Sequence, residues 1–159
     1  MPKSRVARDS TEQKSPVLMI RDAADAMFRA AAECCHQHDR ASRIHAKASL
    51  EAEVETAQRA CEECDSALRE RVEFYEEAAE SVIPGGDDEA WWHNANALWL
   101  ASREYLRRHG GCDSSTKDLK DHSAERLNAL HAEYELEASA LLALRHAADA
   151  YKRLRPTAA

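Results

Sequence analysis

A chain of 159 residues with only four glycines and four prolines, 32% charged and 44% hydrophobic, is typical of one domain built from long helices. Its formal net charge of −7 argues against general binding to nucleic acids or to anionic membranes. No apolar run approaches the roughly 20 residues that span a bilayer, and five cysteines make no disulfide framework, so we expect an acidic cytoplasmic protein with reduced thiols.

The first half of the chain predicts a tail and then helix. Residues 1–14 are polar and without periodicity, and we expect a disordered tail there. No glycine or proline occurs between Val17 and Ile83, where two apolar seams with steps of three and four residues follow each other out of phase. We predict a tight turn within His38–Ser42, between a short helix and a long one. A single very long helix over residues 17–83 is the alternative.

The next stretch, Asp87–Gly111, is predicted to be an inner helix that follows a break at Pro84–Gly86. Asp87 can cap its first turn, and Gly110 and Gly111 supply the backbone freedom of a helix end. Its apolar residues recur at helical period and include all three tryptophans of the chain. We expect the indoles to fill a core. The alternative is an aromatic surface that binds a ligand through Trp91, Trp92 and Trp99.

The last predicted helix begins near Ser115, a capping residue, and ends before Pro156, so that residues 157–159 fray. Residues 15–156 then form one all-α domain, either a four-helix bundle or a pair of long antiparallel hairpins. Because its long helices would outreach the short ones, part of the last seam would lack cover within the chain (Leu141, Leu144, Ala148 and Tyr151). We therefore predict a homodimer with coiled-coil-like contacts.

Two segments contain residue types that bind metals. Cys61 and Cys64 form a C-x-x-C pair, and Cys34–His38 contains two cysteines and two histidines. A turn near Asp39 would hold the two segments roughly 20 Å apart along the bundle, so we expect the cysteines to act as small buried apolar residues. Glu33 and His36 also form one E-x-x-H pair, of which di-iron bundles need two.

Arg103 and His109 resemble the Arg-x(4–6)-His pair of the HEPN superfamily, helical bundles that include ribonucleases. The resemblance covers this one helix, and the same spacing occurs at Arg29/His36, Arg40/His45 and Arg126/His131. It implies a catalytic role for Arg103 and His109, across a dimer interface. The simpler interpretation is that these cations complement the C-terminal end of a helix dipole.

The sequence therefore favours a non-enzymatic scaffold that acts through protein–protein interaction between helices and through homodimerisation. We predict no cofactor. One alternative is a metal- or cofactor-binding bundle whose interior holds zinc or iron through Glu33, His36, His38 and Glu137. The other is a HEPN-like ribonuclease.

Overall fold

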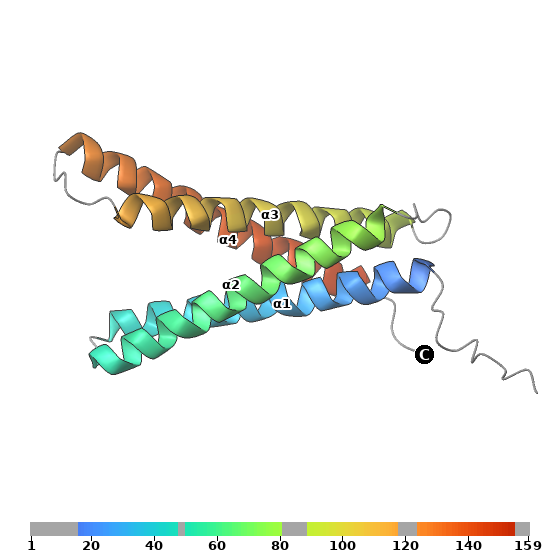
Figure 1. The fold of residues 1–159 in the computed structure, drawn as a ribbon, viewed down its shortest axis with the longest axis horizontal. Coiled ribbons are helices and arrows are strands. Elements are labelled where there is room, and N and C mark those ends of the chain that lie inside the picture. The colour runs from blue at the N-terminus through green and yellow to red at the C-terminus, as the bar shows by residue number, and fades with distance from the viewer. Residues whose placement is uncertain (1–15, 48–49, 81–88, 118–123, 155–159) are drawn as a thin grey trace, which may run out of the picture.

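The structure is a computed structural model that describes residues 16–47, 50–80, 89–117 and 124–154. These ranges form four helices of similar length and no strand: α1 (Pro16–Ala46), α2 (Glu51–Ala79), α3 (Glu89–Lys117) and α4 (Ala124–Leu154) (Figure 1). The predicted all-α four-helix fold is thus confirmed. The tail over residues 1–14, the break at Pro84–Gly86, the cap at Asp87 and the frayed end at 157–159 lie outside the described residues.

The predicted turn within His38–Ser42 and the predicted helix end at Gly110–Gly111 are both wrong, and the last helix begins at Ala124 instead of near Ser115. α1 continues through His38–Ser42 to Ala46, and α2 begins at Glu51 after an extended Leu50, so neither a turn near Asp39 nor one helix over 17–83 exists. Nothing in His38–Ser42 opposes a helix, because the segment lacks glycine and proline. α3 runs past Gly110 and Gly111 to Lys117 and includes Ser115. A glycine costs only about 1 kcal/mol within a helix, which neighbouring turns can offset.

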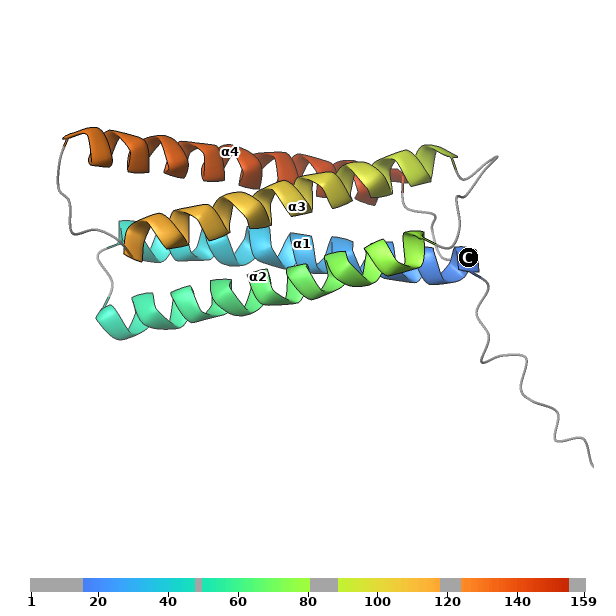
Figure 2. The same cartoon turned by 45° about the horizontal axis from the view of Figure 1, so that its top comes forward.

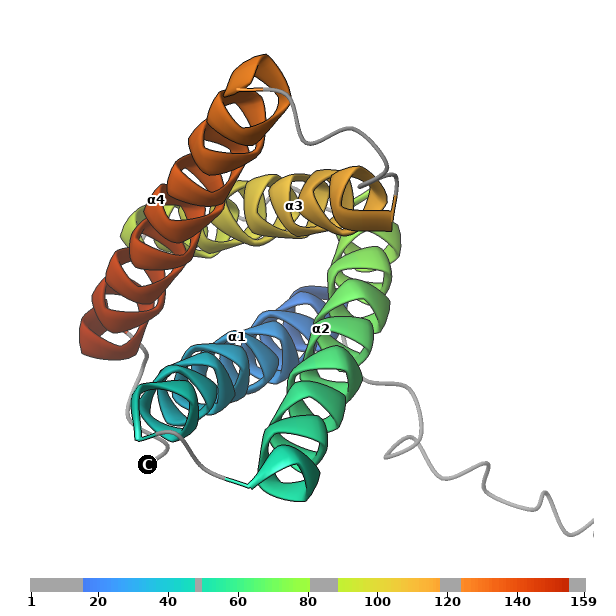
Figure 3. The same ribbon diagram turned by 90° about the vertical axis from the view of Figure 1, so that its left-hand side faces the viewer.

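The helices pair as two antiparallel hairpins, α1 with α2 and α3 with α4 (Figure 2). Between the hairpins, α1 packs mainly against α4, and α2 against α3. The hairpins cross at an angle, so they meet at one end of the molecule and diverge at the other (Figures 1 and 3). We call the divergent part the open end. It consists of residues 40–47 of α1, 51–60 of α2, 110–117 of α3 and 124–136 of α4.

The core lies at the end where the hairpins meet. Ile20, Met27, Leu68, Leu98 and Leu144 are fully buried there. A chain of hydrogen bonds ties three helices together: Trp91 Nε1 donates to Tyr151 Oη (3.2 Å), which donates to Asp25 Oδ1 (2.6 Å). The predicted apolar face of α3 packs into this core, with Trp91, Ala95, Leu98, Tyr105 and Leu106 buried, whereas the opposite face of the helix is exposed.

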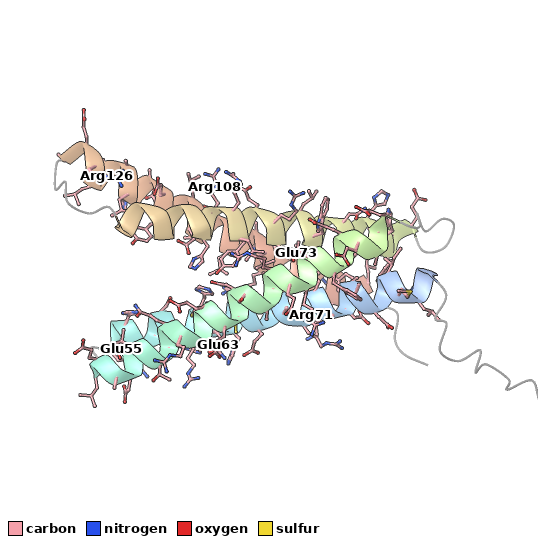
Figure 4. The ribbon with its side chains drawn as sticks, viewed as in Figure 1. Glu55, Glu63, Arg71, Glu73, Arg108 and Arg126 are labelled. Atoms are coloured by element: carbon pink, nitrogen blue, oxygen red, sulfur yellow. The ribbon has the colours of Figure 1, made fainter. Side chains whose placement is uncertain are left out.

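Charged side chains cover the outside of the bundle. Glu55, Glu63 and Arg71 of α2 are exposed and project from the helix surface (Figure 4). Among the described helices, none is long and apolar enough to cross a membrane. The polar outer surface and apolar interior are the pattern expected when helices bury one stripe each.

The burial of the apolar seam of α4 contradicts the prediction that this seam lacks cover within the chain, on which the expected dimer was based. Leu144, Ala148 and Tyr151, which were expected to lack cover, are buried within the chain, and Leu141 packs against the same core. The reason is that the helices have similar lengths, so no long helix outreaches a short one. The first half of α4 has no buried residue, and Leu127, Tyr134 and Leu136 in it are each nearly half exposed.

Candidate functional site

A polar layer with a contribution from every helix lies where the core gives way to the open end. α1 supplies His38, α2 supplies Asp65, α3 supplies Tyr105 and His109, and α4 supplies Glu137. Asp65 is only 4% exposed, although most buried positions of this chain are apolar. Buried carboxylates are rare unless they are paired. The contacts of Asp65 therefore determine the properties of this layer.

The two oxygens of Asp65 have different partners. Oδ1 accepts a hydrogen bond from Tyr105 Oη (2.8 Å) and lies 3.2 Å from His38 Nε2. Since the Tyr105 proton is directed at Asp65, His38 Nε2 must carry the proton in its short contact with the Tyr105 oxygen (2.5 Å). Oδ2 lies 3.0 Å from His109 Nε2. That distance makes an ion pair, but no donor is aligned on Oδ2 with hydrogen-bond geometry.

His109 lies between two carboxylates. Its Nδ1 is 2.5 Å from Glu137 Oε1, while its Nε2 faces Asp65. Close polar contact with Asp65 and then with Glu137 outweighs burial and raises the pKa of His109 to about 10. Burial alone would raise the pKa of Asp65, but its contacts with His109, His38 and Tyr105 hold that pKa well below its usual range. His109 is therefore a cation and Asp65 an anion at neutral pH.

This charge state limits the chemistry of the layer. A general base must accept a proton near neutral pH, and His109 already holds one firmly. Tyr105 cannot ionise readily, because burial and then the charge of Asp65 raise its pKa. A partly buried ion pair of this kind favours one pairing of the helices, since a different register would leave a charge without its partner. The arrangement supports a role in specifying the fold and in coupling stability to pH.

The two cysteine-containing segments lie side by side, contrary to the expected 20 Å separation. With the chain reversing beyond Lys47, His38 meets Asp65, and Cys34 lies close enough to Cys64 for the two to interact electrostatically. Burial, followed by the charge of Asp65, raises the pKa of the Cys34 thiol far above its usual range, and burial raises the pKa of Cys61 to about 11. Both thiols are therefore protonated at neutral pH unless a bound metal ion displaces the proton.

The four predicted metal ligands lie in two different places. His38 and Glu137 belong to the polar layer. Glu33 instead accepts a hydrogen bond from Gln37 on the surface, and His36 is exposed. In the parts of the chain that the structure describes, no group of three histidine, cysteine, aspartate or glutamate side chains has the geometry to hold a metal ion.

Arg103 and His109 also have separate surroundings. Arg103 lies over the Trp99 ring, 5.2 Å from its centroid, and 3.5 Å from Glu76 Oε1. His109 faces Asp65 and Glu137 in the polar layer. The pair that resembles the HEPN motif is therefore distributed over two environments.

Two of the three indoles line a pocket between α2 and α3. Trp91 is buried in the core, whereas Trp92 and Trp99 are partly exposed. We call this cavity of about 390 Å³ the aromatic pocket; its walls are Tyr75, Glu76, Ala79, Glu80, Trp92, Asn96, Trp99 and Arg103. Two hydrogen bonds join its walls: Trp99 Nε1 donates to Glu76 Oε1 (2.9 Å), and Tyr75 Oη donates to Asn96 Oδ1 (2.8 Å). Of the three tryptophans that the sequence suggested as an alternative ligand surface, Trp92 and Trp99 line this pocket and Trp91 does not.

Asp65 and Tyr105 were absent from the residues that the sequence singled out as candidates for chemistry. A signal for Asp65 was nevertheless present: it follows Cys61 by four positions and precedes Leu68 by three, so it lies on the buried stripe of α2. Tyr105 lies at an apolar position of the helical period of α3, but its partner on another helix has no signature in the local sequence.

Comparisons with protein-family models, curated proteins and solved structures find no match to this chain.

Proposed function

We propose that this protein is a non-enzymatic helical interaction module that forms a homodimer through its open end. The observation that supports this is the distribution of burial along α4. All four of its buried residues lie at or after Ala140, whereas Leu127 and Leu136 in its first half are 48% and 45% exposed. Leu142 and Leu154 in the second half are equally exposed (49% and 50%), so what distinguishes the first half is that none of its residues is buried. A helix half with exposed apolar side chains and no buried face is typical of a contact surface.

A second copy of the chain is the occupant that the charges favour. Residues 40–47 of α1 carry Arg40, Arg43 and Lys47 and no acidic residue. Residues 124–139 of α4 carry four glutamates and one arginine. Within one chain these two segments diverge (Figures 1 and 3). In a two-fold dimer, the acidic segment of each copy would lie against the basic segment of the other, which gives two identical contacts.

Analytical ultracentrifugation at micromolar concentration tests the dimer. We expect the parent to sediment as a dimer and the double variant Leu127→Glu/Leu136→Glu as a monomer with an unchanged helical circular dichroism spectrum. Leu100→Glu is the matched control, because Leu100 is similarly exposed but lies in the middle of α3, away from the open end. A parent that sediments only as a monomer would refute the proposal.

A charge exchange tests which segments meet. One variant reverses the acidic segment (Glu133→Lys/Glu135→Lys), and the other reverses the basic segment (Arg40→Glu/Arg43→Glu). Each alone should be monomeric, because like charges would face each other in both contacts. Mixed together, the two variants should form a heterodimer, since opposite charges then meet in both contacts. Homodimers of either variant that are as stable as the parent would exclude this pairing of α1 with α4.

A further inference from the structure

The aromatic pocket has the composition of a site for an organic cation. Its volume of about 390 Å³ falls within the range of roughly 300–1,000 Å³ typical of small-molecule sites. Three aromatic side chains from two helices line it: Tyr75 from α2, and Trp92 and Trp99 from α3. The rings of Tyr75 and Trp92 lie with centroids 6.3 Å apart and planes inclined by 38°, so they form adjacent walls.

Carboxylates complete the pocket. Glu76, in the last turn of α2, and Glu80, the residue that caps the C-terminal end of α2, are both wall residues. The hydrogen bond from Trp99 Nε1 holds the Glu76 carboxylate next to the aromatic walls. A cation placed in the pocket would thus meet the negative faces of aromatic rings and the negative charge of carboxylates together, which is the combination that favours ammonium groups over neutral ligands.

The chain already places one of its own cations at the edge of this pocket. The guanidinium carbon of Arg103 lies 5.2 Å from the centroid of the Trp99 ring, and its Nε is 3.5 Å from Glu76 Oε1. The Arg103 side chain is nevertheless 57% exposed, so it can move into solvent without disturbing the core. The contacts of Arg103 with Trp99 and Glu76 show that these walls can accommodate a cation. Arg103 would therefore compete with a cationic ligand.

We propose that the aromatic pocket binds a ligand with a trimethylammonium group, a cation whose bulk and diffuse charge suit a wall of several rings. Free choline and the side chain of trimethyl-lysine both carry this group. The pocket lies near the C-terminal end of α2, away from the open end, so ligand binding and dimerisation can succeed or fail separately.

Titration with choline, followed by tryptophan fluorescence and by the indole N–H signals in NMR spectra, tests this site. We expect saturable binding that shifts the Trp92 and Trp99 signals more than that of buried Trp91. The control ligand is 3,3-dimethylbutan-1-ol, which has the shape of choline without its charge. It should bind about 2- to 30-fold more weakly, the ratio that corresponds to one cation–π contact. An acetylated trimethyl-lysine amide, titrated in parallel, distinguishes the two sources of the group by its relative affinity.

Three substitutions should affect the affinity for choline in three different ways. Glu80→Gln removes a pocket carboxylate and should weaken choline binding several-fold, whereas Glu77→Gln, an exposed residue outside the pocket on the same helix, should not change it. Arg103→Gln removes the competing cation and should strengthen binding. Equal affinity for choline and its neutral analogue, no saturable binding of choline, or weaker binding by Arg103→Gln would each overturn the proposal.

Discussion

The Asp65–His109 ion pair predicts how the stability of the protein depends on pH. The folded state raises the pKa of His109 from the ordinary value of 6.5 to about 10. Between these two values the folded chain holds a proton that the unfolded chain releases. The stabilisation is therefore complete below pH 6.5 and is lost as the pH rises toward about 10. One unit of pKa corresponds to about 1.36 kcal/mol.

The size of the stability change follows from the pH range in which His109 dominates the pH dependence of unfolding. From about pH 7 to about pH 8.5, we expect the free energy of unfolding to fall by about 2 kcal/mol, since 1.5 units multiply about 1.36 kcal/mol. The window ends there because the raised pKa values of buried thiols, such as Cys34 and Cys61, add a similar loss at higher pH. Urea unfolding, followed by circular dichroism and extrapolated linearly to zero denaturant, measures the change.

Asp65→Asn is the decisive variant. It removes the largest contribution to the raised pKa of His109, so the fall between pH 7 and 8.5 should be much smaller than in the parent. It should also destabilise the protein near neutral pH, but by less than the roughly 3–5 kcal/mol that breaking a fully buried ion pair costs, because His109 is 23% exposed and keeps Glu137 as a partner. If this variant does not fold, Glu137→Gln removes the second carboxylate partner of His109 at a less buried position.

Glu62→Gln is the matched control, because Glu62 is an exposed carboxylate on the same helix, and it keeps the same thiols. It should reproduce the pH dependence of the parent. The reasoning would be refuted if the stability of the parent were constant across the window. It would also be refuted if Asp65→Asn retained the full slope.

The remaining predictions concern stability and metal content. Leu144→Ala should lower the free energy of unfolding by about 2–5 kcal/mol, since Leu144 is fully buried, whereas Leu127→Ala should cost much less; equal losses in urea unfolding would contradict the burial pattern. Tyr151→Phe should cost about 1–2 kcal/mol, because Trp91 and Asp25 lose a shared partner; an unchanged midpoint would contradict this. Arg145→Ala should cost under about 1 kcal/mol, since its ion pair with Asp39 is exposed, and a larger loss would show a role beyond that pair. Native mass spectrometry of untagged protein should detect no zinc or iron; one ion per chain would restore the metal-binding alternative.

Local patterns were sufficient for the helical character of the chain and for which face of α3 points inward. The apolar positions around Trp91, Leu98 and Tyr105 recur at the period of a helix, and that period alone fixes one side of it. The same reasoning failed at helix ends. A change of seam phase near Asp39 looked like a turn, and Gly110–Gly111 looked like a stop, yet α1 and α3 continue through both. Packing against other helices outweighs such weak local preferences.

The composition of the polar layer depended on the tertiary structure. In an antiparallel hairpin, moving the turn by n residues changes the partner of each residue by about 2n positions. Because the chain reverses between α1 and α2 and not near Asp39, Cys34 lies close to Cys64 and His38 meets Asp65. The contact of Asp65 with His109 also depends on how two hairpins cross. The sequence determined which side chains face inward, because that depends on neighbours within a few turns. Only the assembled helices decided which charges meet, because that depends on residues up to about a hundred positions apart, as in the pair of Arg145 with Asp39.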